Sequence, residues 1–211
     1  MKVLLVNGSP HKEGCTYTAL TEAAKTLNKE GIETEIFWIG NKPLSGCIAC
    51  KKCVELGKCV FNDSVNEFRE LAENADGFIF GTPVHYAAAS GAMTSFMDRL
   101  FYSEVCGNDN KAFYMKPAAC VISARRAGTT AAFDQMNKYF TIQEMPIVSS
   151  RYWNMVHGTK PEEVLQDEEG LYTMRALGRN MAFLLKCKEA GLKAGVELPE
   201  KEPRIATNFI R

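Results

Sequence analysis

The chain has 211 residues, enough to bury a sizeable hydrophobic core, and this length excludes a short peptide or a disulfide-stapled miniprotein. Hydrophobic residues make up 46% and charged residues 24%, as in folded globular proteins and unlike disordered chains. Because 25 basic residues balance 25 acidic ones, no net charge favours a nucleic acid or an acidic membrane surface as a partner.

Short runs of β-branched and aromatic residues alternate with segments of helical period. The runs predict strands at Lys2 to Asn7, Thr34 to Ile39, Gly77 to Gly81, Ala118 to Ser123 and Pro146 to Ser149. Apolar residues at helical spacing predict helices around residues 20–27, 65–75, 92–101 and 132–140. A last helix is predicted from Glu169 to Ala190, with Leu171, Met174, Leu177, Met181 and Leu184 facing inward.

Strict alternation of strands and helices is typical of a parallel sheet with crossover helices. The sequence therefore predicts an α/β fold: a flavodoxin-like doubly wound sheet of five parallel strands, in the order 2-1-3-4-5, with helices on both faces. A Rossmann-like order of six strands is the rival prediction. Since no linker, composition break or repeat divides the chain, we expect a single domain at residues 1–190, with a cysteine-rich loop at 40–61. A charged C-terminal tail follows at 191–211.

The first apolar run, Val3 to Val6, is too short for the core of a signal peptide. No stretch of the sequence approaches the length of about 18 apolar residues typical of a membrane-spanning helix. We therefore expect a cytoplasmic protein with no membrane partner. In that reducing compartment, clustered cysteines serve metal binding or redox chemistry more often than disulfides.

The first predicted strand runs into a loop of small and hydroxyl-bearing residues, Gly8 to Thr18, and then into a helix. Backbone N–H groups at a helix N-terminus, together with the hydroxyls of Ser9, Thr16 and Thr18, suit a phosphate group. The loop lacks the spacing of a Walker motif and the G-x-G-x-x-G of dinucleotide sites. The pattern favours a terminal phosphate monoester; the alternative is a plain turn in which Thr16 caps the helix.

Three segments together resemble the flavin loops of the flavodoxin-fold NAD(P)H-dependent FMN reductase family. They are Gly8-Ser9-Pro10-His11 with Gly14-Cys15-Thr16, then Thr82 to Tyr86 leading to Ser95 to Arg99, and finally Ser123 to Thr130. The resemblance extends from the start of the chain to about residue 150. It implies an FMN site formed by Ser9, His11, Thr16, Tyr17, Thr18, Thr82, Pro83, Val84, His85, Tyr86, Ser123, Arg125 and Gly128.

Arg125 and Arg126 follow the fourth predicted strand, beside the crevice expected between the first and third strands. A guanidinium near N1 and the C2 carbonyl of a flavin would stabilise the negative charge of the reduced ring, and we favour Arg125 for this role. Alternatively, both arginines are solvated or pair with a carboxylate of another subunit. Trp153, Asn154 and His157 would roof the site, face a partner subunit or pack as an ordinary loop.

Four cysteines form a C-x2-C-x2-C-x5-C motif: Cys47, Cys50, Cys53 and Cys59. Thiolates this closely spaced can surround one cubane cluster. The motif resembles that of iron-sulfur flavoproteins, which carry FMN and a [4Fe-4S] cluster, and the resemblance implies that all four are ligands. A zinc ion, redox-active thiols without metal, and a loop that no longer assembles a cluster are the open alternatives. Cys106, Cys120 and Cys187 are expected to be isolated, buried structural thiols.

Because a flavin itself carries the hydride chemistry, we assign no catalytic side chain. The resemblance implies an FMN-dependent oxidoreductase that takes hydride from NADH or NADPH and reduces a small acceptor such as a flavin, quinone, azo or nitro compound. It also implies a homodimer or homotetramer. The alternative function is an iron-sulfur flavoprotein electron carrier that passes single electrons between a ferredoxin-like donor and FMN, and a redox sensor is a third hypothesis.

Overall fold

The computed structural model of the protein describes residues 1–203, 205, 207 and 209. Its parallel strands are β1 (Lys2–Asn7), β2 (Glu33–Trp38), β3 (Gly77–His85), β5 (Ala118–Ala124) and β6 (Met155–His157), in the order β2-β1-β3-β5-β6. The two-residue strand β4 (Ala88–Ala89) pairs antiparallel with the end of β3 and forms a hairpin. Apart from this hairpin, the order is that of the predicted flavodoxin-like sheet, and the Rossmann-like order is excluded.

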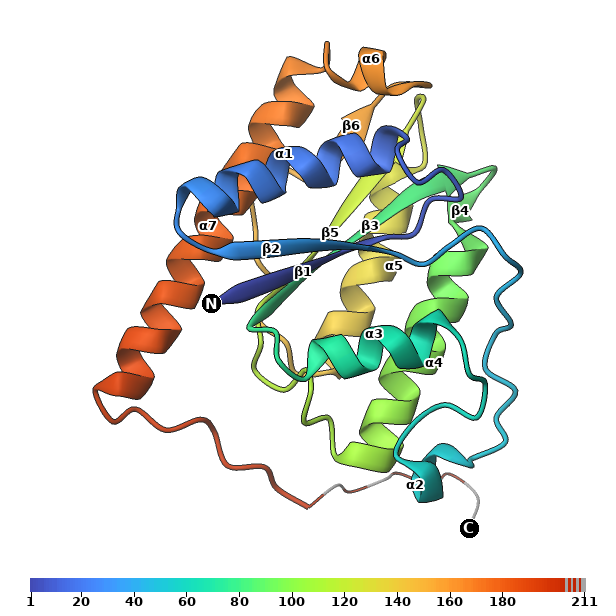
Figure 1. Ribbon diagram of the computed structural model, residues 1–211, viewed down its shortest axis with the longest axis vertical. Coiled ribbons are helices and arrows are strands. Elements are labelled where there is room, and N and C mark those ends of the chain that lie inside the picture. The colour runs from blue at the N-terminus through green and yellow to red at the C-terminus, as the bar shows by residue number, and fades with distance from the viewer. Residues whose placement is uncertain (204, 206, 208, 210–211) are drawn as a thin grey trace.

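Helices cover both faces of the sheet (Figure 1). Helices α1 (Cys15–Lys29) and α7 (Glu168–Lys193) pack on one face. The opposite face is covered by α3 (Ser64–Ala72), α4 (Gly91–Asn108) and α5 (Thr129–Ile142). Two single-turn helices, α2 (Cys53–Leu56) and α6 (Pro161–Val164), lie in the long connections that precede α3 and α7.

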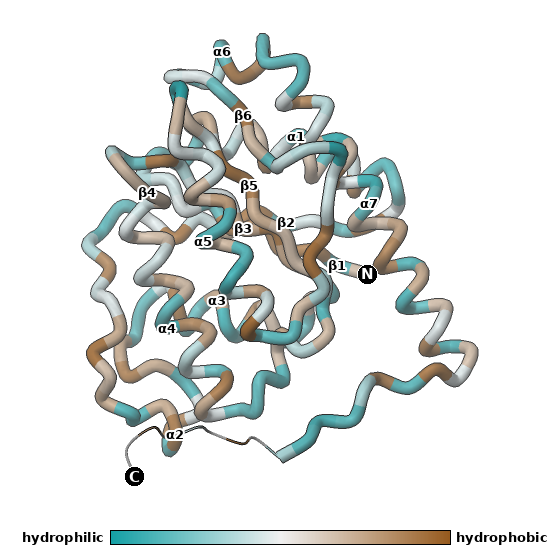
Figure 2. Tube along the Cα trace, turned by 180° about the vertical axis from the view of Figure 1, so that it is seen from behind, coloured by the Kyte–Doolittle hydropathy of each residue, from teal (hydrophilic) through white to brown (hydrophobic). Residues whose placement is uncertain are grey.

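The hydrophobic core has two parts, one on each side of the sheet, because successive side chains of a strand point to opposite faces. Leu4 and Val6 of β1 pack under α3, α4 and α5, whereas Val3 and Leu5 pack under α1 and α7. Phe68 of α3 contacts four other phenylalanine rings at centroid distances of 5.2 to 6.2 Å. The central strands are accordingly among the most hydrophobic parts of the trace (Figure 2).

The outermost strand differs from the prediction. Residues 146–149, expected as the fifth strand, form a single β-bridge, between Ile147 and Ala118. The chain then leaves the sheet and returns as β6, which pairs in parallel with Ile122 to Ala124 of β5. Val148 is buried without belonging to a ladder, so its β-branched signal reflects burial and the predicted strand was wrong.

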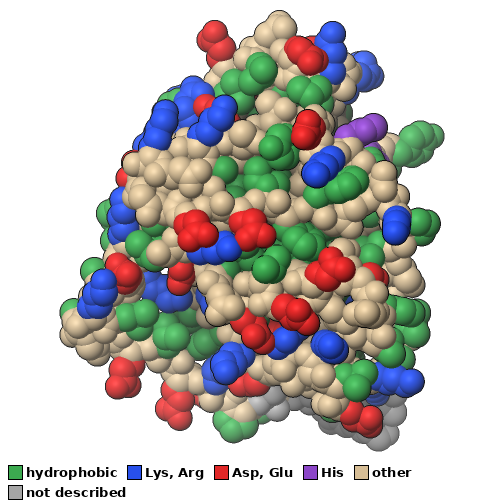
Figure 3. Space-filling view, viewed as in Figure 1, with side chains coloured by type: hydrophobic (Ala, Val, Ile, Leu, Met, Phe, Trp, Pro, Cys, Tyr) green, Lys and Arg blue, Asp and Glu red, His purple; other side chains and the backbone are tan. Residues whose placement is uncertain are grey.

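One residue predicted to face inward on the last helix is also wrong: Leu184 is 37% exposed, whereas its neighbour Leu185 is buried. Cys187 of α7, expected to be buried, is exposed. Basic and acidic side chains are interspersed over the face drawn in Figure 3. Within the part of the chain that the structure describes, no helix combines the length and the apolar character needed to cross a membrane.

Candidate active site

Four loops that follow β1, β3, β5 and β6 converge on one cavity of about 540 Å³ at the carboxyl edge of the sheet. The predicted site residues that line it are Ser9, His11, Thr16, Pro83, Val84, His85, Ser123 and Arg125. Small-molecule sites in proteins have volumes of about 300 to 1,000 Å³. The three predicted flavin loops therefore come together at a cavity large enough for a mononucleotide.

The N-terminus of α1 opens into this cavity. Gly14 is its N-cap residue, no side chain caps it, and its first turn holds no acidic residue. The first backbone N–H groups and the positive end of the helix dipole therefore remain available for an anion. Two basic side chains, Arg125 and Lys160, line the cavity beside one acidic side chain, Glu13. These features fit a phosphate monoester.

Asn7, the last residue of β1, holds the first loop in place. Its side chain is fully buried; Oδ1 accepts a hydrogen bond from the Ser9 N–H at 3.0 Å, and Nδ2 donates to the Lys12 carbonyl at 2.9 Å. From the opposite side, the Trp38 indole N–H donates to the Ser9 carbonyl at 2.8 Å. Asn7 was not among the predicted site residues, because its residue type alone does not indicate the bonds that it makes to the following turn.

The hydroxyls of Thr16 and Ser123 hydrogen-bond to each other at 2.8 Å, and both residues are buried. This bond ties the first turn of α1 to the end of β5. Thr16 does not cap the helix, because Gly14 occupies the cap position. Thr18 directs its hydroxyl to the Gly14 carbonyl at 3.2 Å, and neither Thr18 nor Tyr17 lines the cavity.

The β3–β4 hairpin forms the second wall. Thr82 is buried below it and does not line the cavity; its hydroxyl donates to the Pro83 carbonyl and accepts from the Ser90 N–H, both at 3.1 Å. Tyr86 stands exposed at the tip, with a positive φ of 57°. Thr82 therefore fixes the shape of the hairpin, while Tyr86 is free of protein contacts that would hold its ring.

Gly128 shapes the third loop. It is the N-cap residue of α5, with φ of 93°, and a Cβ there would lie 2.9 Å from Cγ1 of Val84. Gly128 therefore allows the third loop to approach the hairpin, but it does not line the cavity. Of the two arginines that follow β5, Arg125 lines the cavity and Arg126 does not.

The fourth loop, residues 158–161, was missed because its strand was predicted too early in the sequence. Gly158 donates its N–H to the Ala124 carbonyl at 3.0 Å, which brings Thr159 and Lys160 to the cavity. Hydrogen bonds from the Thr159 hydroxyl and N–H lower the pKa of the Glu163 carboxyl, so this acid stays ionised beneath the loop. The cavity lining does not include Trp153, Asn154 or His157.

The four motif cysteines surround a second, narrower hollow, which also contacts Arg99 and Tyr102 of α4. This hollow lies beside α2, at the end of the molecule opposite α6 (Figure 1). Cys53 is buried and Cys59 half-buried, whereas Cys47 and Cys50 are exposed. Among the described residues, no three His, Cys, Asp or Glu side chains are grouped closely enough to bind one metal ion.

Cys106 lies beside the motif in space, contrary to the isolated position expected for it. Gly107 packs so closely on α2 that a Cβ there would lie 2.3 Å from the Cys53 carbonyl oxygen. Burial raises the pKa of the Cys53 thiol, and the nearby thiols of Cys106, Cys50 and Cys47 raise it further. Burial likewise raises the pKa of Cys120, which is a structural thiol in β5 as predicted.

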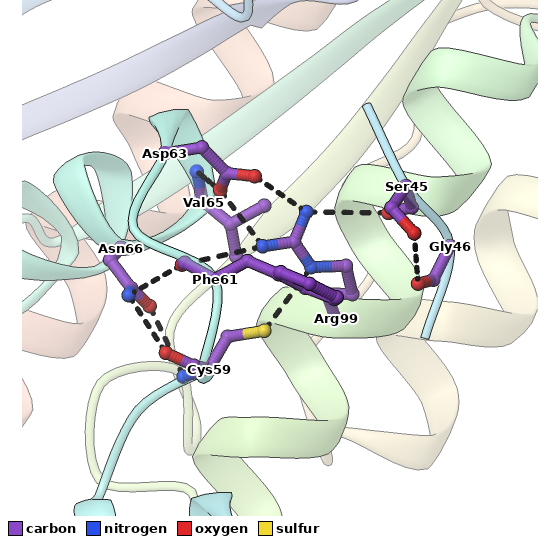
Figure 4. Close-up of polar contacts among 8 residues, drawn as sticks. All are labelled: Ser45, Gly46, Cys59, Phe61, Asp63, Val65, Asn66 and Arg99. Carbon is purple, nitrogen blue, oxygen red and sulfur yellow. Dashed lines mark hydrogen bonds and ion pairs between the residues drawn. The ribbon is translucent and has the colours of Figure 1, made fainter. Parts of the chain in front are cut away.

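Arg99 links the motif to the core (Figure 4). Its buried guanidinium forms a two-pronged ion pair with Asp63, at 2.8 and 2.9 Å, and donates from Nε to the Cys59 sulfur at 3.2 Å. Desolvation is the largest single effect and lowers the pKa of Arg99, but the hydrogen bonds and charges of Asp63 and Cys59 together raise the pKa overall. Asn66 bonds both the N–H and the carbonyl of Cys59, at 3.1 and 2.9 Å.

The doubly wound sheet and the open helix N-terminus at its carboxyl edge define a flavodoxin-like protein with a site for a phosphorylated ligand. A family model described as NADPH-dependent FMN reductase matches residues 1–160. The chain belongs to this family and is an FMN-dependent oxidoreductase.

The chain is also similar to individual proteins, of which the solved structure bears on the fold alone. An iron-sulfur flavoprotein of Methanocaldococcus jannaschii is 32% identical over 195 residues, covering 88% of this chain and 98% of that protein. The FMN reductase (NADPH) of Pseudomonas putida is 27% identical over 100 residues, 47% of either chain. Among solved structures, RosB with a bound riboflavin-phosphate intermediate superposes with a TM-score of 0.69 at 16% identity, covering 100% of this chain and 94% of that one.

We predict that Asn7→Ala weakens FMN binding. The substitution leaves buried backbone groups of the first loop without partners, at a cost of about 1 to 3 kcal/mol. That cost corresponds to an FMN dissociation constant about five to 150 times larger. Titration of flavin fluorescence measures it. Asn28→Ala, which removes only a surface bond to Thr34, is the control, and equal affinities for both variants would contradict the role of Asn7.

Proposed function

We propose that FMN binds in the cavity with its phosphate at the N-terminus of α1 and its ring between the β3–β4 hairpin and the loop after β5. The observation that carries this proposal is the uncapped helix N-terminus in a cavity where four carboxyl-edge loops meet. Ser9 and the backbone N–H groups of α1 would hold the phosphate, and Pro83 and Val84 would contact the ring.

Bound FMN supplies the hydride and electron chemistry, so the chain's own task is to bind and orient it. NADPH is the proposed hydride donor, in keeping with the family, and a small flavin, quinone, azo or nitro compound is the proposed acceptor. Arg125, at the cavity wall, is placed to stabilise negative charge on the reduced ring.

We predict that Arg125→Gln slows flavin reduction by NADPH about tenfold or more, because developing negative charge loses a nearby cation. Anaerobic stopped-flow mixing with NADPH, followed by loss of the flavin absorbance, measures the rate. Arg126→Gln is the matched control, since Arg126 is the adjacent arginine and does not line the cavity. Equal rates for the two variants would exclude the proposed role. If wild-type flavin bleached only with a reduced protein donor, the electron-carrier alternative would replace the reductase.

We propose that Cys47, Cys50, Cys53 and Cys59 bind a [4Fe-4S] cluster. In a cubane cluster each thiolate binds a different iron atom. The four cysteine sulfurs around the hollow therefore do not need the short mutual distances that binding to one shared metal ion would require. A single tetrahedral zinc would require that closeness. Lys51, Lys52 and Lys58, which lie among the cysteines, would offset the cluster's negative charge. The relatives named iron-sulfur flavoproteins support the same assignment.

Metal analysis of protein purified anaerobically tests the cluster. We expect about four iron atoms per chain, and we expect Cys59→Ser to lose most of the iron while its FMN content stays at the wild-type value. Cys187→Ser, at an exposed thiol on α7, is the control and should keep both. Zinc in place of iron, or wild-type protein with neither metal, would refute the proposal.

We propose that the protein is cytoplasmic, since a reducing compartment would keep the cluster ligands as thiols. We also propose that it forms a homo-oligomer. A groove of about 1,030 Å³ runs between α4, α5 and residues 200–203 and reaches Cys47. At this face Tyr102 and Ile142 are 42% and 71% exposed, as expected of a surface that a second copy covers. Because the flavin cavity and the cysteine hollow lie at opposite ends of one chain, contact between copies would also shorten the path between the two cofactors.

We predict that Ile142→Glu lowers the mass of the assembly in solution, because it puts a charge into the buried interface. Light scattering after size-exclusion chromatography measures the mass. Phe183→Glu, on the exposed face of α7, is the control and should leave the mass unchanged. A wild-type monomer, or a wild-type assembly that Ile142→Glu leaves intact, would contradict an interface at this face.

A further inference from the structure

The fourth cysteine of the motif is the one whose sulfur has a defined protein partner. We propose that Arg99 is a positioning residue that closes the cysteine loop and raises the reduction potential of the cluster through Cys59. This inference rests on the proposed cluster at the four motif cysteines. It concerns residues that neither the phosphate cavity nor the flavin loops use.

The guanidinium of Arg99 is fixed in place by its own hydrogen bonds. Besides the bonds to Asp63 and to the Cys59 sulfur, Nη1 donates to the Ser45 carbonyl at 3.3 Å and Nη2 points to the Phe61 carbonyl at 3.5 Å. The ring of Phe61 lies against the same group, 4.8 Å from its central carbon. With its side chain wholly buried, the guanidinium cannot turn away from the sulfur.

These partners lie on both sides of the cysteine motif in the sequence. Ser45 precedes Cys47, and Phe61 and Asp63 follow Cys59, so one side chain of α4 joins the two ends of the loop (Figure 4). Asp63 is itself fixed as the N-cap of α3, where its Oδ1 accepts from the Val65 N–H at 3.2 Å. The loop is therefore held closed by the protein before any metal binds.

The sign of the electrostatic effect follows from charge. Reduction adds an electron to a cluster that is already negative, and N–H donors to its sulfurs and nearby positive charge favour that step. Arg99 supplies one donor and one permanent positive charge. Asp63 partly balances that charge, so the two residues act on the potential in opposite directions.

Opposite shifts distinguish this role from simple structural support. Arg99→Gln should lower the potential of the cluster, because the sulfur loses both the donor and the charge. Asp63→Asn should raise it, because the arginine charge is no longer balanced while the shape and the cap of α3 are kept. Loosening of the loop alone would move both variants in the same direction. Arg99→Lys keeps the positive charge but not the planar set of N–H donors of the guanidinium. Its cluster potential should lie between those of wild type and Arg99→Gln.

The experiment is a redox titration of anaerobic holoprotein with dithionite and mediators, followed by the absorbance and paramagnetic signal of the cluster. Arg69→Gln is the matched control: it breaks another ion pair between α3 and α4, in which a half-buried Arg69 meets the buried Glu104 and neither residue bonds a sulfur. It should lower stability and leave the potential unchanged. FMN content reports whether each variant is folded.

Each outcome separates the two proposals. Wild-type protein without iron refutes the cluster itself. If wild type holds the cluster, unchanged potentials or shifts in one direction refute the role of Arg99. If Arg99→Gln retains no iron, the Asp63→Asn variant decides the role of Arg99: a higher cluster potential supports it, and an unchanged or lower potential refutes it. Metal-free protein tests independently whether Arg99 holds the cysteine loop closed. Trypsin should cut after Lys51, Lys52 and Lys58 faster in Arg99→Gln than in wild type. Equal cleavage rates would overturn the proposed closure of the loop.

Discussion

The flavin cavity depends on two positions without side chains: Gly8, which directly follows β1, and Gly81, which lies within the adjacent strand β3. The Gly8 N–H donates to the Gly81 carbonyl at 2.8 Å. A Cβ on Gly8 would lie 2.5 Å from the Met93 side chain, and one on Gly81 would lie 2.8 Å from the side chains of Thr16 and Leu20. The first turn of α1 can therefore rest directly on the sheet edge, where the loops after β1 and β3 diverge.

That contact explains why local sequence signals could predict much of the flavin cavity. Strands rich in β-branched residues, each followed by small and polar residues, fix which loops meet at the carboxyl edge once the order 2-1-3 is given. Ser9 and Pro83 could be assigned to one cavity for this reason, whereas Ser123 was assigned to it through the family resemblance. The fourth loop escaped because the buried Val148 resembles a strand residue, whereas the ladder forms at Met155 to His157.

The residues that hold both sites in shape could not be predicted in the same way. Asn7 satisfies backbone groups of the next turn, a role that its type alone does not indicate. Arg99 and Asp63 lie 36 positions apart, and their pairing requires α3 and α4 to pack side by side. From sequence alone, a charged residue on an apolar helix is predicted to be solvent-exposed, because the partner that allows its burial is not known.

The two sites differ in what their polar groups leave unsatisfied. At the cavity, the N–H groups of α1 are left open, so an anion can enter and complete their hydrogen bonding. At the cysteine hollow, Arg99 pairs with Asp63 and bonds the Cys59 sulfur, and Asn66 bonds the Cys59 backbone, before any ligand arrives. The first arrangement suits a cofactor held by its phosphate. The second suits a redox group that must keep its geometry while its charge changes, because a surrounding that is already ordered reorganises little when an electron arrives.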